Sequence, residues 1–121
     1  EFVSALEKVR QPFNTNAIAQ AGAMAALDDD HHLSKTRELN TKGLHFFESL
    51  CTKLGCELVP SSANFVLMKV GDGQAVFHAL QKQGVITRPM GGYGLPEWIR
   101  LSVGTTDENQ KAADALVAAL A

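Results

Sequence analysis

Trp98-Ile99-Arg100-Leu101-Ser102-Val103 is the stretch that best defines the fold, because its apolar and polar residues alternate. A strand points successive side chains to opposite faces, so Ile99, Leu101 and Val103 share one face. Arg100 lies on the other face. The stretch therefore predicts a half-buried β-strand that carries an arginine on its second face.

The neighbouring segments predict a small domain in which strands and helices are mixed. The expected elements are strands at residues 56–60, 64–70, 85–88 and 98–103, a helix through 75–80 that stops at Gly84, and a last helix capped by Thr106. This order predicts the α+β class, with a short, mostly antiparallel sheet and helices in two layers.

The first half of the chain predicts helices only. Residues 17–27 are rich in alanine and apolar on every side. A helix without a polar face is stable when most of its surface is buried, so we expect it to pack against a partner surface. A helix of some 24 residues follows and would be around 35 Å long, the reach of a connection between domains. We therefore expect three segments: residues 1–30 as an arm with an Ala-rich helix at an interface, residues 31–55 as a connecting helix, and residues 56–121 as the small domain.

Composition excludes several classes of protein. The chain has 121 residues, of which 45% are hydrophobic and 20% charged, as in ordinary globular domains rather than disordered or disulfide-rich chains. The net charge of -2 indicates no nucleic-acid partner, and no apolar run approaches the roughly 18 residues of a membrane span. Cys51 and Cys56 form no CxxC pattern, so reduced thiols and a cytoplasmic location are expected. The helix-like opening without a start methionine predicts a piece of a longer polypeptide.

Arg88 and Arg100 are the candidate binding residues. Both lie in apolar strands that flank a glycine-rich loop, and Pro89 holds Arg88 in an extended geometry. A guanidinium on a sheet needs water, a carboxylate or a ligand anion as its partner. The residues alone leave an exposed-face arginine and an anion site equally open.

The other polar motifs predict no complete active site. Gly91-Gly92-Tyr93-Gly94 lacks the GK[ST] of a phosphate loop and is interpreted as a turn, with Tyr93 as a possible pocket residue. The adjacent His31 and His32 have poor spacing for a metal, so no metal site is expected. No serine or cysteine has a visible base, so no catalytic residue is assigned. Asn64 is expected to start a strand or bond to the turn, with pocket lining as the alternative.

Taken in order, seven motifs resemble the C-terminal third of the histidinol-phosphate aminotransferases, which are class I/II pyridoxal-phosphate aminotransferases. They are Val-Arg-Gln-Pro-Phe-Asn at 9–14, Ala-Leu-Asp at 26–28, Arg-Glu-Leu-Asn at 37–40, Pro-Ser-Ser-Ala-Asn-Phe-Val-Leu at 60–67, Gly-Val-Ile-Thr-Arg-Pro at 84–89, Tyr-Gly-Leu-Pro at 93–96 and Trp-Ile-Arg-Leu-Ser-Val-Gly-Thr at 98–105. The resemblance covers essentially the whole chain.

The resemblance implies the C-terminal part of a fold type I pyridoxal-phosphate transferase, dimeric in the complete enzyme and joined to a missing large domain that carries the cofactor. The chain shows no match to the family's Schiff-base lysine motif, so it is expected to be inactive alone and to hold no covalently bound cofactor. Arg100 matches the arginine that binds the substrate anion, and Arg88 matches a second arginine near the phosphate. The implied substrates are histidinol phosphate and glutamate or 2-oxoglutarate.

Two alternatives stay open. The chain could belong to an aminotransferase or decarboxylase of the same fold that acts on another phosphorylated or aromatic amine. It could also be a non-catalytic α+β module that binds a small anion.

Overall fold

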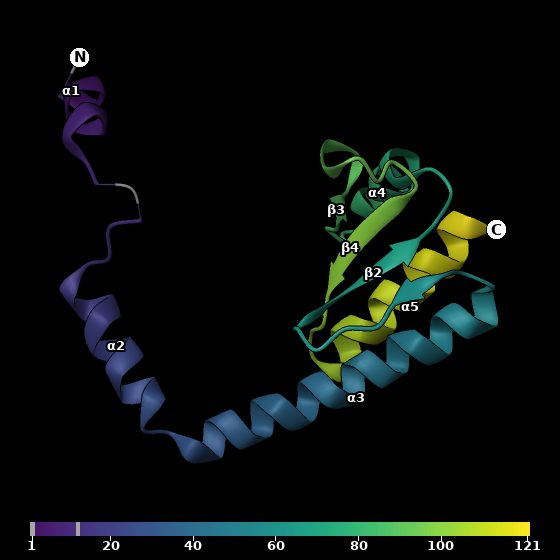
Figure 1. The fold of residues 1–121 in the computed structure, drawn as a ribbon, viewed down its shortest axis with the longest axis horizontal. Helices are drawn as coiled ribbons and strands as arrows, with labels where there is room; N and C mark the ends of the chain where they lie inside the picture. The colour runs from purple at the N-terminus through teal and green to yellow at the C-terminus, as the bar shows by residue number, and fades with distance from the viewer. Residues whose placement is uncertain (1, 12) are drawn as a thin grey trace. The chain divides into compact units, whose positions relative to one another are not determined.

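The computed structural model of the protein describes residues 2–11 and 13–121. The elements, shown in Figure 1, are α1 (Phe2–Val9), α2 (Ala17–Leu27), α3 (Asp30–Leu54), β1 (Leu58–Val59), β2 (Phe65–Lys69), α4 (Gly73–Lys82), β3 (Arg88–Pro89), the 3-10 turn η1 (Gly91–Tyr93), β4 (Trp98–Ser102) and α5 (Thr106–Leu120). The chain divides into two compact units, one that ends at Ser34 and one that spans Lys35–Ala121.

The second unit is built on a four-stranded sheet in the order β1-β2-β4-β3, and each neighbouring pair is antiparallel. Val66 of β2 and Ile99 of β4 are completely buried on the inner face. The buried residues that complete the core come from α3, α4 and α5, so helices cover this one face and leave the other open. The prediction of an α+β domain with two layers and an antiparallel sheet is confirmed.

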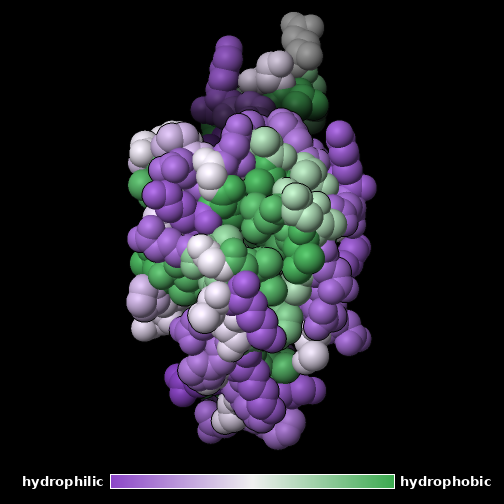
Figure 2. Space-filling view, turned by 90° about the vertical axis from the view of Figure 1, so that its right-hand side faces the viewer, coloured by the Kyte–Doolittle hydropathy of each residue, from purple (hydrophilic) through white to green (hydrophobic). Residues whose placement is uncertain are grey.

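The C-terminal half of α3 is part of this core. Phe47 is 0% exposed and Cys51 is 2% exposed, and both pack against residues of the sheet, α4 and α5. Gly43 lies where α3 passes the loop after β4, and a Cβ there would meet the Val103 side chain. Half-buried apolar residues, such as Leu50 and Leu120, extend the core outward. Hydrophobic side chains accordingly reach the surface in the face shown in Figure 2.

Strand β3 is shorter than expected and begins three residues later. The predicted strand was 85–88, whereas the ladder holds only Arg88 and Pro89. The cause is the end of α4, where Gly84 has a φ of +74° and the N–H of Val85 donates to the carbonyl of Leu80 at 3.0 Å. This bond takes the N–H of Val85 into the end of the helix, and the ladder with β4 begins at Arg88.

The N-cap of α5 is Thr105, so the prediction of Thr106 is wrong. The Thr105 hydroxyl accepts a bond from the Glu108 N–H at 3.4 Å, and the Glu108 carboxylate accepts one from the Thr105 N–H at 2.8 Å. This reciprocal pair is a capping box, which satisfies two backbone donors at the start of the helix. Thr106 is the first helical residue instead.

The Glu108→Gln variant is expected to lose less of its unfolding free energy than the parent chain does when the pH is lowered. The bonds from the Thr105 backbone and side chain lower the pKa of Glu108 below its ordinary 4.5. A lowered folded-state pKa means that the box stabilises fully above the unfolded pKa and weakens as the pH falls through the folded value. Urea unfolding, followed by the fluorescence of the single tryptophan at neutral pH and below about pH 4, measures this difference in stability.

The control is Asp107→Asn, which removes a carboxylate from the same turn. An equal acid loss in Glu108→Gln and the parent chain would contradict the assignment.

The first unit consists of α1, α2 and the start of α3. Asn16 caps α2, and its side chain accepts a bond from the Ala19 N–H at 2.8 Å. None of the α2 residues is buried, and Phe13 is fully exposed. The expectation that residues 1–30 pack on a partner surface stays a prediction.

None of the helices within residues 2–11 and 13–121 combines the length and the hydrophobicity that crossing a bilayer requires.

Candidate functional site

The structure brings Arg88 and Arg100 together in the sheet. The register of the β3–β4 pair places Arg88 directly opposite Arg100, and Pro89 opposite Ile99. Ile99 is buried on the inner face, so the arginines, one position away on each strand, share the open face. Arg100 is half-buried and Arg88 is exposed.

Within residues 2–11 and 13–121, no carboxylate forms an ion pair with Arg88 or Arg100. Like charges directly opposite each other destabilise a sheet, yet the ion pairs among the described residues include neither Arg88 nor Arg100. The guanidinium carbon of Arg100 lies 5.1 Å from the centroid of the Phe65 ring, a cation–π contact that holds the group in place. Guanidinium groups can bind carboxylates and phosphates through paired hydrogen bonds, so the two arginines stay the candidate binding residues.

Lys69 shows how a cation on the same face is neutralised when a carboxylate is near. It lies on β2 two positions from Leu67, the direct partner of Arg100. Its Nζ is 3.4 Å from Oε2 of Glu97. Among the described residues, the open face therefore contains a lysine in an ion pair and two arginines that form none.

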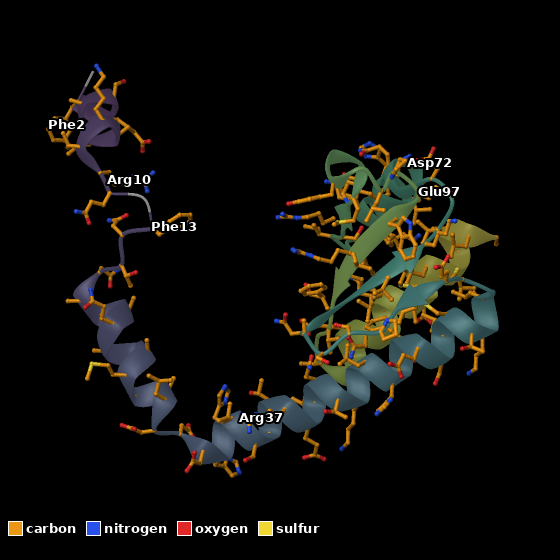
Figure 3. All side chains as sticks on the ribbon, in the orientation of Figure 1. Phe2, Arg10, Phe13, Arg37, Asp72 and Glu97 are labelled. Carbon is orange, nitrogen blue, oxygen red and sulfur yellow. The ribbon has the colours of Figure 1, made fainter. Side chains whose placement is uncertain are left out.

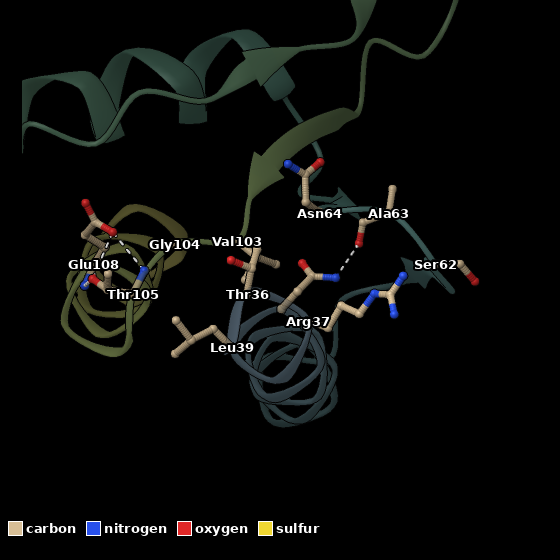
Figure 4. Close-up of a pocket in the computed structure, with 11 residues that line it drawn as sticks. Thr36, Arg37, Leu39, Ser62, Ala63, Asn64, Val103, Gly104, Thr105 and Glu108 are labelled. Atoms are coloured by element: carbon tan, nitrogen blue, oxygen red, sulfur yellow. Dashed lines mark hydrogen bonds between the residues drawn. The ribbon is translucent and has the colours of Figure 1, made fainter. Parts of the chain in front are cut away.

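A groove of about 490 Å³ adjoins the end of the sheet where β2 begins and β4 ends. Its walls come from α3, the loop before β2 and the loop before α5, and Arg37 of α3 (Figure 3) supplies a guanidinium. In Figure 4, Arg37 reaches toward the loop that carries Ser62. The Asn40 Nδ2 donates to the Ala63 carbonyl at 3.0 Å and joins the helix to this loop. The groove thus lies between α3 and the end of the sheet, and neither Arg88 nor Arg100 lines it.

Asn64 precedes β2, which begins at Phe65, and agrees with the pocket-lining alternative. Its backbone carbonyl accepts a bond from the Val103 N–H at 2.8 Å, next to the first residue of β2, and it also lines the groove. The side-chain bonds of this turn come from Ser61, whose hydroxyl donates to the Phe65 carbonyl at 2.6 Å. Tyr93 lies in η1 and is 67% exposed, and it is not among the groove residues.

The described residues form no metal-binding cluster, and no lysine among them lines the groove. No group of three histidine, cysteine or acidic side chains within residues 2–11 and 13–121 could hold a metal ion. Six of the seven lysines are exposed, and the seventh, Lys69, is paired with Glu97.

Sequence reasoning did not find Phe65, Arg37 or Asn40 as site residues. Phe65 has a signal, because the alternation of β2 places it on the open face and the register sets it diagonal to Arg100. Arg37 and Asn40 carry none, since their place at the groove depends on how α3 packs against a loop 23 residues further along the chain.

The fold is a small α+β domain whose open sheet face presents Arg88 directly opposite Arg100. The family Aminotransferase class I and II matches residues 1–116, and the chain belongs to this family. It is 47% identical to the histidinol-phosphate aminotransferase of Akkermansia muciniphila over 93% of its own length and 31% of that protein. It is 48% identical to histidinol-phosphate aminotransferase 2 of Ralstonia nicotianae, over 100% of its own length and 33% of that protein.

Solved structures agree with this assignment. Histidinol-phosphate aminotransferase from Sinorhizobium meliloti, in complex with pyridoxal-5'-phosphate, superposes with a TM-score of 0.80 and 26% identity. The match covers 97% of this chain and 33% of that one. The enzyme from Clostridium acetobutylicum shares the fold with a TM-score of 0.75. The chain thus spans about a third of the length of the relatives it matches.

Proposed function

We propose that this chain is the substrate-recognising C-terminal region of a histidinol-phosphate aminotransferase. The reaction would convert histidinol phosphate and 2-oxoglutarate to imidazole acetol phosphate and glutamate in histidine biosynthesis. The observation that carries the proposal is that Arg88 lies opposite Arg100 on the open face and that, in the part of the chain that the structure describes, neither forms an ion pair with a carboxylate. The identity of 47–48% to curated histidinol-phosphate aminotransferases supports this substrate.

In this proposal Arg100 binds the anion that both substrates carry. This anion is the phosphate of histidinol phosphate, or the α-carboxylate of glutamate or 2-oxoglutarate. The planar guanidinium can donate two parallel bonds to either group. The Phe65 ring restricts the orientation of Arg100, and Arg88 adds a second charge for the phosphate. Both arginines are binding residues, and no catalytic residue is assigned to this chain.

The complete enzyme would use pyridoxal phosphate, which supplies the electron-withdrawing ring for the transfer of an amino group. The residues of this chain do not fit its covalent attachment. None of the seven lysines lines the 490 Å³ groove, and Lys69, which shares the open face, is paired with Glu97. We therefore assign the attachment to the missing large domain and expect this chain to be inactive by itself. In the complete enzyme we also propose a cytoplasmic homodimer.

The test compares substrates in the complete enzyme that contains this segment. The kcat/KM for histidinol phosphate is expected to exceed that for aromatic amino acids by at least about tenfold. Equal or faster turnover of an aromatic amine without phosphate would favour the alternative aminotransferase or decarboxylase. The 121-residue chain incubated with pyridoxal phosphate and borohydride should gain no stoichiometric covalent adduct. Such an adduct would contradict the assignment of the lysine to the large domain.

A further inference from the structure

The two cysteines of the chain lie at the two ends of the hydrogen-bonded turn that ends α3. Gly55, with a φ of +68°, follows the last helical residue. The N–H of Cys56 donates to the carbonyl of Cys51 at 2.9 Å, and the N–H of Gly55 donates to that of Thr52 at 3.4 Å. These two bonds define a Schellman motif. In this motif the side chains at the positions that Cys51 and Cys56 occupy commonly contact each other.

The backbone bond limits the distance between the two cysteines. Standard bond lengths and the bent Cα–C–O angle on either side of the 2.9 Å contact allow at most about 6.8 Å between the two Cα atoms. Disulfides span roughly 4.4–6.8 Å between Cα atoms. The cap of α3 therefore holds the two residues within the range that a disulfide can bridge.

Both cysteines also line one hollow, with Glu48, Thr52, Leu58 and Pro60. Cys51 is 2% exposed and Cys56 is half-buried, so a reagent reaches Cys56 first. Burial raises the pKa of Cys51 to about 11, and the neighbouring Cys56 adds to this rise. Burial also raises the pKa of Cys56. The thiols are thus mainly protonated at neutral pH, which makes their oxidation slow and favours the reduced pair at rest.

We propose that Cys51 and Cys56 form a redox-modifiable pair, which a peroxide converts to an intramolecular disulfide that closes the C-terminal turn of α3. The Cys56 sulfur attacks one peroxide oxygen, the O–O bond breaks, and a sulfenic acid and water form. The Cys51 sulfur then loses its proton and attacks the Cys56 sulfur, and the displaced hydroxide takes up that proton as water. Two thiols and one hydrogen peroxide give one disulfide and two waters, so the pair supplies both electrons.

Intact mass after oxidation tests this in the full chain, which contains only these two cysteines. The folded chain is treated with hydrogen peroxide, the peroxide is removed, and the chain is unfolded in denaturant and alkylated at a mildly alkaline pH. We expect a monomer that has lost two hydrogens and takes up no alkyl group. Cys51→Ala and Cys56→Ser each leave one thiol, and neither variant should show this product. Disulfide-linked dimers, or folded monomers with sulfinic acid and no closed pair, would overturn the proposal.

A second measurement separates the folded geometry from simple proximity in sequence. The ratio of disulfide to dithiol is measured in glutathione buffers, in native solution and in denaturant. The fold is expected to raise this ratio at least about tenfold. An equal ratio in the two solutions, or a higher one in denaturant, would show that the cap of α3 does not favour the bond.

Discussion

Replacing Arg100 by alanine in the complete aminotransferase is expected to lower kcat/KM for histidinol phosphate and for glutamate alike. A charge-assisted hydrogen bond contributes about 1.5–3 kcal/mol, which corresponds to a loss of roughly ten- to a hundredfold. Both substrates should be affected because, under the proposed function, each binds to the Arg100 guanidinium through an anionic group. Steady-state kinetics with each substrate in turn measures the effect.

The controls for Arg100→Ala come from the same open face. Lys69→Ala removes a cation that already has Glu97 as its partner, 3.4 Å away, and should leave kcat/KM nearly unchanged. Arg100→Lys keeps the charge but loses the planar fork, so an intermediate loss is expected. Wild-type kcat/KM for both substrates in Arg100→Ala would show that the anion binds elsewhere.

Phe47→Ala is expected to cause the largest loss of stability in the chain. Phe47 is 0% exposed and belongs to the core cluster between α3 and the sheet. Truncation of a buried phenylalanine costs about 3–5 kcal/mol through lost burial and the cavity left behind. Since small domains have about 5–15 kcal/mol of stability, this substitution removes much of the total. Urea unfolding reported by Trp98, which lies in β4 of the same unit, measures the shift.

Phe13→Ala is the matched control for Phe47→Ala. It makes the same chemical change at a side chain that is fully exposed. Its effect on the unfolding free energy is expected to stay within about 0.5 kcal/mol. If Phe47→Ala shifted the midpoint no more than Phe13→Ala does, Phe47 would not be part of the stabilising core.

Local sequence signals account for most of the elements. The alternation in residues 98–103 predicted β4 and its open face, and Asn16 and Gly55 mark helix ends that the structure confirms. These predictions succeeded because alternation and capping depend on contacts between near neighbours in the chain. The start of β3 at Arg88 was missed because the end of α4 competes for the N–H of Val85.

The sequence by itself determined the fold class, the resemblance to the aminotransferase family and the choice of Arg88 and Arg100. Only the tertiary structure decided that the two arginines face each other, that Phe65 lies beside Arg100, and that Asn40 joins α3 to the groove. These facts depend on strand register and helix packing between residues far apart in the chain. Such contacts form only when the strands pair and the helices pack on the sheet, so local sequence patterns do not predict them.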